Sequence, residues 1–150
     1  MNEKERAVEL FKEGFNCSQA VFTAFAHRFG IDEETAKKIS AGLGGGIGRM
    51  REVCGAVSGA AMVIGSIVSA TDGKDSDGKQ KNYELVREFA ERFTKRNGGI
   101  ICRELLGLDV KMEKSAAPEK RTAEYYKKRP CVELVADAAE ILTELIKENE

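Results

Sequence analysis

Residues 53–70 read VCGAVSGAAMVIGSIVSA and carry no charged side chain. The length of this stretch alone would allow a membrane span, but only seven of its residues are large aliphatics or methionine. Gly55 and Gly59 stand four positions apart, a spacing that lets a second helix approach closely. We therefore interpret the stretch as the central helix of a bundle, rich in small residues and buried on all sides.

Helical periodicity continues on both sides of this stretch, and alternating β-branched runs are absent. The pattern predicts helices at about residues 2–13, 17–29 and 32–42 before it, and at about 81–97, 118–128 and 131–148 after it. Residues 71–81 form the longest expected loop, and residues 102–107 a short helical turn. The sequence thus predicts an all-α fold, a single domain over residues 1–150 with six to eight helices.

The charges are almost balanced, with 24 basic and 25 acidic residues and a formal net charge of -1. No basic stripe or aromatic platform stands out, so we expect no nucleic-acid partner. The first 14 residues are charged and amphipathic and lack the apolar core of a signal peptide. We therefore expect a cytoplasmic protein without a membrane span. In a reducing cytoplasm, thiols are more often catalytic, redox-active or metal-binding than joined in structural disulfides.

The four cysteines each fall where a different helix is expected to begin: Cys17, Cys54, Cys102 and Cys131. A helix N-terminus carries a partial positive charge and free N–H groups. This environment favours the thiolate, which is the form that attacks disulfides or binds metal. We therefore predict a sulfur-based site, with the four cysteines gathered at one end of the bundle.

A glycine-rich segment, AGLGGGIGRM at residues 41–50, lies just before Cys54. It has neither the Lys-Ser/Thr of a phosphate-binding loop nor the GxGxxG spacing of a dinucleotide fold. One interpretation is a tight connection between helices. The other is a binding loop whose N–H groups hold an anion, a sulfide or a thiolate with help from Arg49 and Arg51. For this second interpretation the candidate cofactor-binding residues are Gly44, Gly45, Gly46 and Arg49.

Three other features are weaker candidates for a site. Residues 73–84 resemble a calcium-binding EF-hand loop, but Gly73 stands where the first acidic ligand belongs. We therefore expect a solvated loop there. His27, the only histidine, and Glu52, two residues before Cys54, are interpreted as surface residues.

The spacing of the cysteines limits the chemistry. No two of them form a CxxC pair, which argues against a thioredoxin-type dithiol and against a zinc ribbon. Cysteines from distant elements can still form exchangeable disulfides or surround an iron–sulfur cluster. Both arrangements stay open at this point.

The segments around the cysteines read FNCSQAV, GGGIGRMREVCGAVSGA, CRELLG and RPCVELV. Together they make the chain resemble the C-GCAxxG-C-C family of redox proteins over nearly its whole length. The central motif departs from the family's name, because Cys54 precedes Gly55 and gives CGAxxG, with Ala56 and Gly59 in place. The resemblance implies a redox-active role that depends on the cysteines, and it leaves the substrate and the cofactor open.

Our first hypothesis is thiol–disulfide chemistry or electron transfer through the four cysteines, with an unknown redox partner. Cys54 is the predicted most acidic thiol, because a helix start, the glycine-rich segment and two arginines lie near it in sequence. The alternative is a metal-binding protein that holds an iron–sulfur cluster, or less favourably zinc, on the same cysteines. A third hypothesis is a non-catalytic interaction module. The sequence leaves open whether the protein is a thiol oxidoreductase or an electron carrier, and whether it forms a homo-oligomer.

Overall fold

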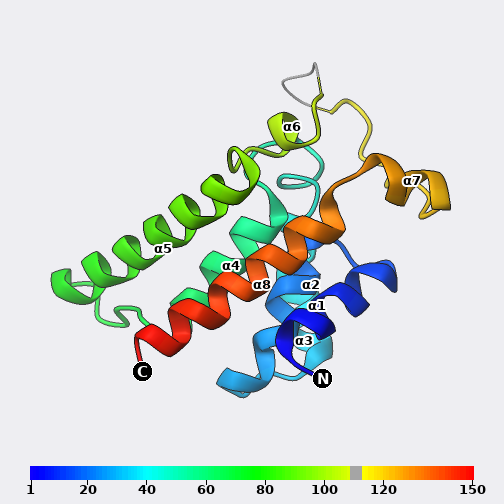
Figure 1. The fold of residues 1–150 in the computed structure, drawn as a ribbon. Coiled ribbons are helices and arrows are strands. Elements are labelled where there is room, and N and C mark those ends of the chain that lie inside the picture. Colours follow the sequence, from blue (N-terminus) through cyan, green and yellow to red (C-terminus); the bar gives the residue numbers. More distant parts are fainter. Residues whose placement is uncertain (109–112) are drawn as a thin grey trace.

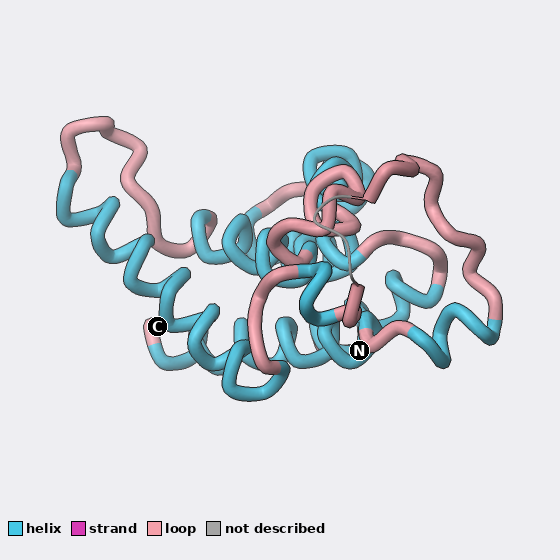
Figure 2. The backbone as a smooth tube through the Cα atoms, turned by 90° about the horizontal axis from the view of Figure 1, so that it is seen from above, coloured by secondary structure: helices cyan, strands magenta, loops and turns pink. Residues whose placement is uncertain are grey.

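The computed structural model describes residues 1–108 and 113–150, and this part of the chain contains eight α-helices, two 3-10 segments and no strand (Figures 1 and 2). The all-α prediction is confirmed. In chain order the α-helices are α1 (Glu3–Lys12), α2 (Cys17–Phe25), α3 (Glu33–Ser40), α4 (Gly55–Gly65), α5 (Ser76–Asn97), α6 (Cys102–Leu105), α7 (Ala123–Lys128) and α8 (Cys131–Glu148). The 3-10 segments η1 (Ala26–Phe29) and η2 (Ala41–Leu43) extend α2 and α3, so the predicted helices 17–29 and 32–42 each end in a tighter turn.

Helix α4 lies in the middle of the bundle and packs against α2, α5 and α8. Seven of its 11 residues are buried. A Cβ atom added at Gly59 would lie 2.9 Å from the carbonyl oxygen of Ser18, and one at Gly55 would lie 3.0 Å from the Ser18 nitrogen. The glycine pair therefore lets the backbones of α2 and α4 touch, as its spacing predicts.

The uncharged stretch is only partly helical. Helix α4 ends at Gly65, and residues 66–70 continue as a turn and an irregular segment. No helix among the described residues is both long enough and apolar enough to cross a membrane. The cytoplasmic location stays a prediction.

Helix α8 runs beside α4 and contacts α1 and α5 as well. Its bounds agree with the predicted helix at 131–148. Nine of its residues are buried, and they recur at helical spacing from Cys131 to Ile146. This regular apolar face supplies a large part of the core, since burial of each aliphatic side chain stabilises the fold by about 1.5–3 kcal/mol.

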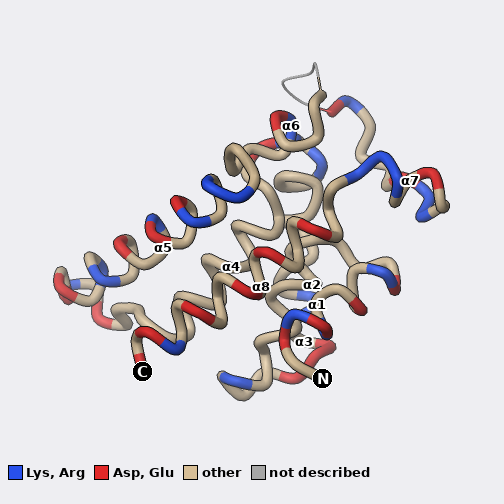
Figure 3. The backbone as a smooth tube through the Cα atoms, in the orientation of Figure 1, with Lys and Arg blue, Asp and Glu red and all other residues tan. Residues whose placement is uncertain are grey.

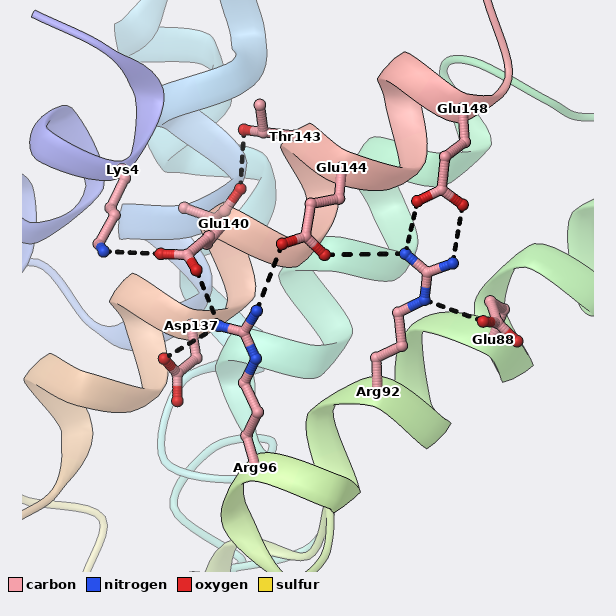
Figure 4. A network of polar contacts seen from close by, with 10 residues as sticks. Lys4, Glu88, Arg92, Arg96, Asp137, Glu140, Thr143, Glu144 and Glu148 are labelled. Carbon is pink, nitrogen blue, oxygen red and sulfur yellow. Dashed lines mark hydrogen bonds and ion pairs between the residues drawn. The ribbon is translucent and has the colours of Figure 1, made fainter.

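Helix α5 lies along α8. Its contacts are of two kinds, buried aromatic packing and ion pairs between α5 and α8. Phe89 and Phe93 are fully buried and stack with ring centroids 5.9 Å apart. Above them, Arg92 donates two hydrogen bonds to Glu148 at 2.7 and 2.8 Å, and Arg96 reaches three carboxylates of α8 (Figure 4). Half-exposed ion pairs contribute little each, so the phenylalanines dominate this contact.

The start of α5 differs from the prediction. The sequence predicts a loop over 71–81 and a helix from about residue 81, whereas α5 begins at Ser76. The Asp75 side chain accepts a hydrogen bond from the Gly78 N–H at 2.9 Å and so starts the helix among polar residues. The tract that resembles an EF-hand is mostly helix, so it forms no calcium-binding loop.

Candidate functional site

All four cysteines line one cavity of about 70 Å³. Cys17, Cys102 and Cys131 are the first residues of α2, α6 and α8, and Cys54 is the residue directly before α4. Cys17 is half-buried, and the other three are buried. No disulfide joins them, and each is a free cysteine. The predicted gathering of the four helix starts is therefore confirmed.

Cys54 and Cys102 are brought together by a short antiparallel pairing. Val53 and Ile101 form an isolated β-bridge. The Cys54 N–H donates to the Ile100 carbonyl at 2.8 Å, and the Cys102 N–H donates to the Glu52 carbonyl at 2.6 Å. Since side chains alternate across an extended backbone, Cys54 and Cys102 lie on the same face of this pairing and both reach the cavity.

Cys17 and Cys131 enter the cavity from α2 and α8, which pack against each other. Asn16 caps α2 and accepts a hydrogen bond from the Gln19 N–H at 2.9 Å. Pro130 precedes α8, where its fixed φ favours a helix start. The two helix starts are thus set by local sequence, and the packing of the helices places the two thiols together.

The glycine-rich segment lines one side of the site, and much of its backbone lies in the left-handed region of φ and ψ. Its backbone has positive φ at Gly45 (66°), Gly46 (71°) and Gly48 (53°), and also at the non-glycine residues Ile47 (67°) and Arg49 (63°). Such a conformation is costly for a branched residue. The segment is held by hydrogen bonds between its own backbone groups, with the amides of residues 47–52 donating to carbonyls of residues 42–47.

This segment is both a tight connection and a lining of the site. Gly45 and Gly46 line the cysteine cavity, and Gly44, Gly45 and Arg49 line a larger pocket beside it. A Cβ atom at Gly46 would lie 2.7 Å from the Cys102 Cβ, so only glycine fits there. The amides of residues 47–52 are paired within the segment and are not free to donate to an anion or a sulfide. The binding role of Gly44, Gly45, Gly46 and Arg49 stays a prediction.

The prediction that Cys54 is the most acidic thiol is wrong. Burial raises the pKa of Cys54 from 9.0 to about 12, although backbone N–H groups of α4 partly oppose this effect. Burial also raises the pKa of Cys102. Arg51 opposes that rise, because its Nη1 donates to the Cys102 sulfur at 3.6 Å. Burial of the Cys54 sulfur away from water thus raises its pKa by more than the N–H groups at the helix start lower it.

Cys131 is the thiol that the site makes acidic. Hydrogen bonding from Cys17 is the largest cause of its lowered pKa, and the positive charges of Arg129, Arg121 and Arg51 add to the effect against burial. The pKa of Cys17 is raised well above 9.0 by the same hydrogen bond and by burial. Within this pair, Cys131 is therefore the thiol whose thiolate the site favours, and Cys17 is the thiol that holds its proton more strongly.

Three further residues line the site and were not predicted from the sequence: Arg121, Tyr125 and Arg129. Arg121 donates to the carbonyl oxygens of Phe11 and Phe15 at 2.6 and 2.9 Å, and its guanidinium lies 4.1 Å from the centre of the Phe11 ring. These contacts hold its charge beside the cavity. Arg129 stands two positions before Cys131, and this proximity was the one signal that could have identified it.

The two weaker side-chain candidates lie at the surface, as predicted. His27 is 67% exposed and contacts Glu3 at 3.0 Å. Glu52 is exposed and pairs with Arg103 at 3.3 Å. Neither side chain lines the cavity.

The cysteines do not fit a metal centre in this arrangement. Across residues 1–108 and 113–150, no group of three or more His, Cys, Asp or Glu side chains is placed to hold a metal ion. Tetrahedral zinc and iron–sulfur clusters both need such a group.

A family model described as "Putative redox-active protein (C_GCAxxG_C_C)" matches residues 15–145. The matched region contains all four cysteines, the glycine-rich segment and the arginines that line the site. No curated protein and no solved structure matches the chain.

Proposed function

Because the chain belongs to the C_GCAxxG_C_C family, we propose that it is a thiol–disulfide oxidoreductase in which Cys131 is the attacking thiolate and Cys17 the resolving thiol. The observation that carries this proposal is that Cys17 and Cys131 line one cavity, in which the pKa of Cys131 is lowered and that of Cys17 is raised. A thiolate at neutral pH next to a protonated thiol is the arrangement that exchange requires.

The first step forms one sulfur–sulfur bond and breaks another. The Cys131 thiolate attacks a sulfur of a substrate disulfide, which gives a mixed disulfide on Cys131 and expels the other substrate sulfur as a thiolate. Arg129, Arg121 and Arg51 stabilise the attacking thiolate. The expelled thiolate takes up a proton.

The second step uses Cys17. Once Cys131 is in the mixed disulfide, Cys17 no longer faces a negative sulfur, so the main cause of its raised pKa is gone. Cys17 loses its proton and attacks the Cys131 sulfur, which releases the second substrate thiol and leaves a Cys17–Cys131 disulfide. Two electrons pass to the substrate, and an external dithiol must return them to close the cycle.

Trapping of the intermediate tests this order of events. Reduced Cys17→Ala protein, treated anaerobically with bis(2-hydroxyethyl) disulfide, should accumulate a mixed disulfide on Cys131, read by peptide mass spectrometry. The unsubstituted protein should instead collect a Cys17–Cys131 bond. Cys54→Ala and Cys102→Ala are the matched controls and should still form that bond. A mixed disulfide found on Cys54 or Cys102 would contradict the proposal.

A further inference from the structure

A second pocket of about 370 Å³ adjoins the cysteine cavity and is not used by the exchange steps above. The two share part of their lining, including Arg51, Arg121, Tyr125 and Cys131. Cys131 therefore faces both spaces, whereas Cys17, Cys54 and Cys102 line only the cavity. A molecule in the larger pocket meets Cys131 before any other cysteine.

This larger pocket is strongly basic. Among the described residues, four arginines and a single glutamate line it: Arg49, Arg51, Arg121, Arg129 and Glu119. Figure 3 shows basic positions on the chain between α7 and α8, where Arg129 lies. Arg129 pairs with Glu119, but Arg121 donates to backbone carbonyls and has no carboxylate partner among the described residues. The pocket thus keeps a net positive charge.

Arg51 is buried beside this pocket, and its charge is only weakly paired. Its side chain is only 7% exposed, and its Nη2 lies 3.8 Å from the Glu113 carboxylate. Its Nε is buried and has no hydrogen-bond acceptor in the described part of the chain. An unpaired buried N–H of a charged group is costly. The Arg51 side chain also lines the basic pocket, so an anionic ligand there would lie beside its positive charge.

The size of the pocket limits the class of ligand. A volume of about 370 Å³ is at the lower end of the range for small-molecule sites. Carboxylates are the anions that arginine binds with paired hydrogen bonds. A small molecule that carries carboxylates and a disulfide would satisfy the arginines and present its sulfurs to Cys131.

We infer that the basic pocket selects small disulfides bearing carboxylate groups and holds them against Cys131. This inference rests on the proposed thiol–disulfide exchange and names its substrate class. The chemistry is the exchange already given, in which the substrate disulfide is reduced and Cys17 and Cys131 are oxidised.

A series of disulfides of similar size and different charge tests the inference. The probes are 3,3′-dithiodipropionate (anionic), bis(2-hydroxyethyl) disulfide (neutral) and cystamine (cationic). Rates of oxidation of the reduced protein are measured anaerobically for each probe. A thiolate without neighbouring positive charges repels an anionic disulfide, so it should react more slowly with the anionic probe than with the neutral one. A faster reaction of the protein with the anionic probe would therefore indicate attraction by the arginines. We expect the anionic probe to react fastest, and its advantage to fall with added salt.

The readout is the ratio of the rate constants for the anionic and the neutral probe. Both probes meet the same thiolate, so this ratio removes the effect of any change in the nucleophilicity of Cys131. In Arg49→Gln the ratio should fall by roughly fivefold, the effect of about 1 kcal/mol of lost charge interaction. Arg87→Gln is the matched control, because Arg87 is an exposed arginine of α5 that lines neither the cavity nor the basic pocket. It should keep the ratio of the unsubstituted protein.

The outcomes separate the inference from the proposed function. If the neutral probe oxidises Cys17 and Cys131 but the anionic probe is no faster, the inference is wrong and the exchange stands. An unchanged ratio in Arg49→Gln also overturns the inference. If no probe oxidises the pair, the proposed function itself fails.

Discussion

Cys17 begins α2, Cys131 begins α8, and the hydrogen bond between their side chains makes Cys131 the more acidic thiol of the pair. Both occupy the same position in a helix, so the helix dipole cannot distinguish them. The hydrogen bond from Cys17 is the largest cause of the lowered pKa of Cys131, and the positive charges of Arg129, Arg121 and Arg51 lower it further. The site is thus asymmetric, with a lowered pKa at Cys131 and a raised pKa at Cys17.

We predict that Cys17→Ala raises the pKa of Cys131, because the substitution removes the largest cause of its lowering. The rate of alkylation of Cys131 by iodoacetamide, followed across pH by peptide mass spectrometry, should therefore rise at higher pH in the variant. Cys102→Ala is the control, since Cys102 is not the hydrogen-bond partner of Cys131. Equal titration curves for Cys131 with and without Cys17 would disprove that Cys17 lowers the pKa of Cys131.

A second prediction concerns alkaline stability. The folded-state pKa of Cys54 is raised from 9.0 to about 12, so the folded protein keeps this proton longer than the unfolded chain does. The stabilisation is fully present below pH 9 and is lost as the pH rises towards 12, by about 1.4 kcal/mol per pH unit. Tyr125, whose pKa burial raises to about 12, acts in the same direction.

Urea unfolding between pH 8 and about 11 measures this effect as a slope. The Cys54→Ala variant should be less stable near pH 8, because it leaves a small gap in the core. Its free energy of unfolding should then fall less steeply above pH 9 than that of the unsubstituted protein. Parallel slopes in the two proteins would show that Cys54 titrates normally in the fold.

The parts of the fold that follow from local pattern were predictable. The bounds of α8 agree with the predicted 131–148, because its apolar positions recur at helical spacing without interruption. The start of α5 was missed because residues 76–81 are polar, and the Asp75 cap rather than an apolar face begins that helix. Helix starts made by a single capping residue leave little trace in hydrophobic periodicity.

The chemistry of the site was predictable only in outline. Its four cysteines share a helix-start position that is visible in the sequence, and they do line one cavity. The acidity of each thiol depends on burial and on charges from distant segments, so Cys54 was the wrong choice for the thiolate. Arg51, near Cys54 in sequence, contacts Cys102 instead. Arg121 reaches the cavity from the segment before α7, far along the chain from α1 and α2.

The contact between α2 and α4 gives a third prediction. Gly59→Ala would place a Cβ 2.9 Å from a backbone oxygen of Ser18, and overpacking against backbone costs about 1–3 kcal/mol. Gly65→Ala is the matched control on the same helix, because no atom lies within 4 Å of its added Cβ. We expect the control to stabilise the protein by up to about 1 kcal/mol through its helix propensity. Thermal unfolding that ranks the two variants the other way would contradict the close approach of the helices.

The last prediction concerns metal. Reconstitution of the reduced protein under anaerobic conditions with iron and sulfide should leave it colourless, with four titratable thiols. The physical reason is that, in the described ranges, no group of three or more ligand side chains is placed to hold a metal ion, and a cluster needs such a group. Absorbance spectra and iron analysis before and after desalting measure the result. A stable visible band that is lost on replacing any one cysteine would show that the four sulfurs rearrange around a cluster. The function of the site would then be cluster binding and not thiol–disulfide exchange.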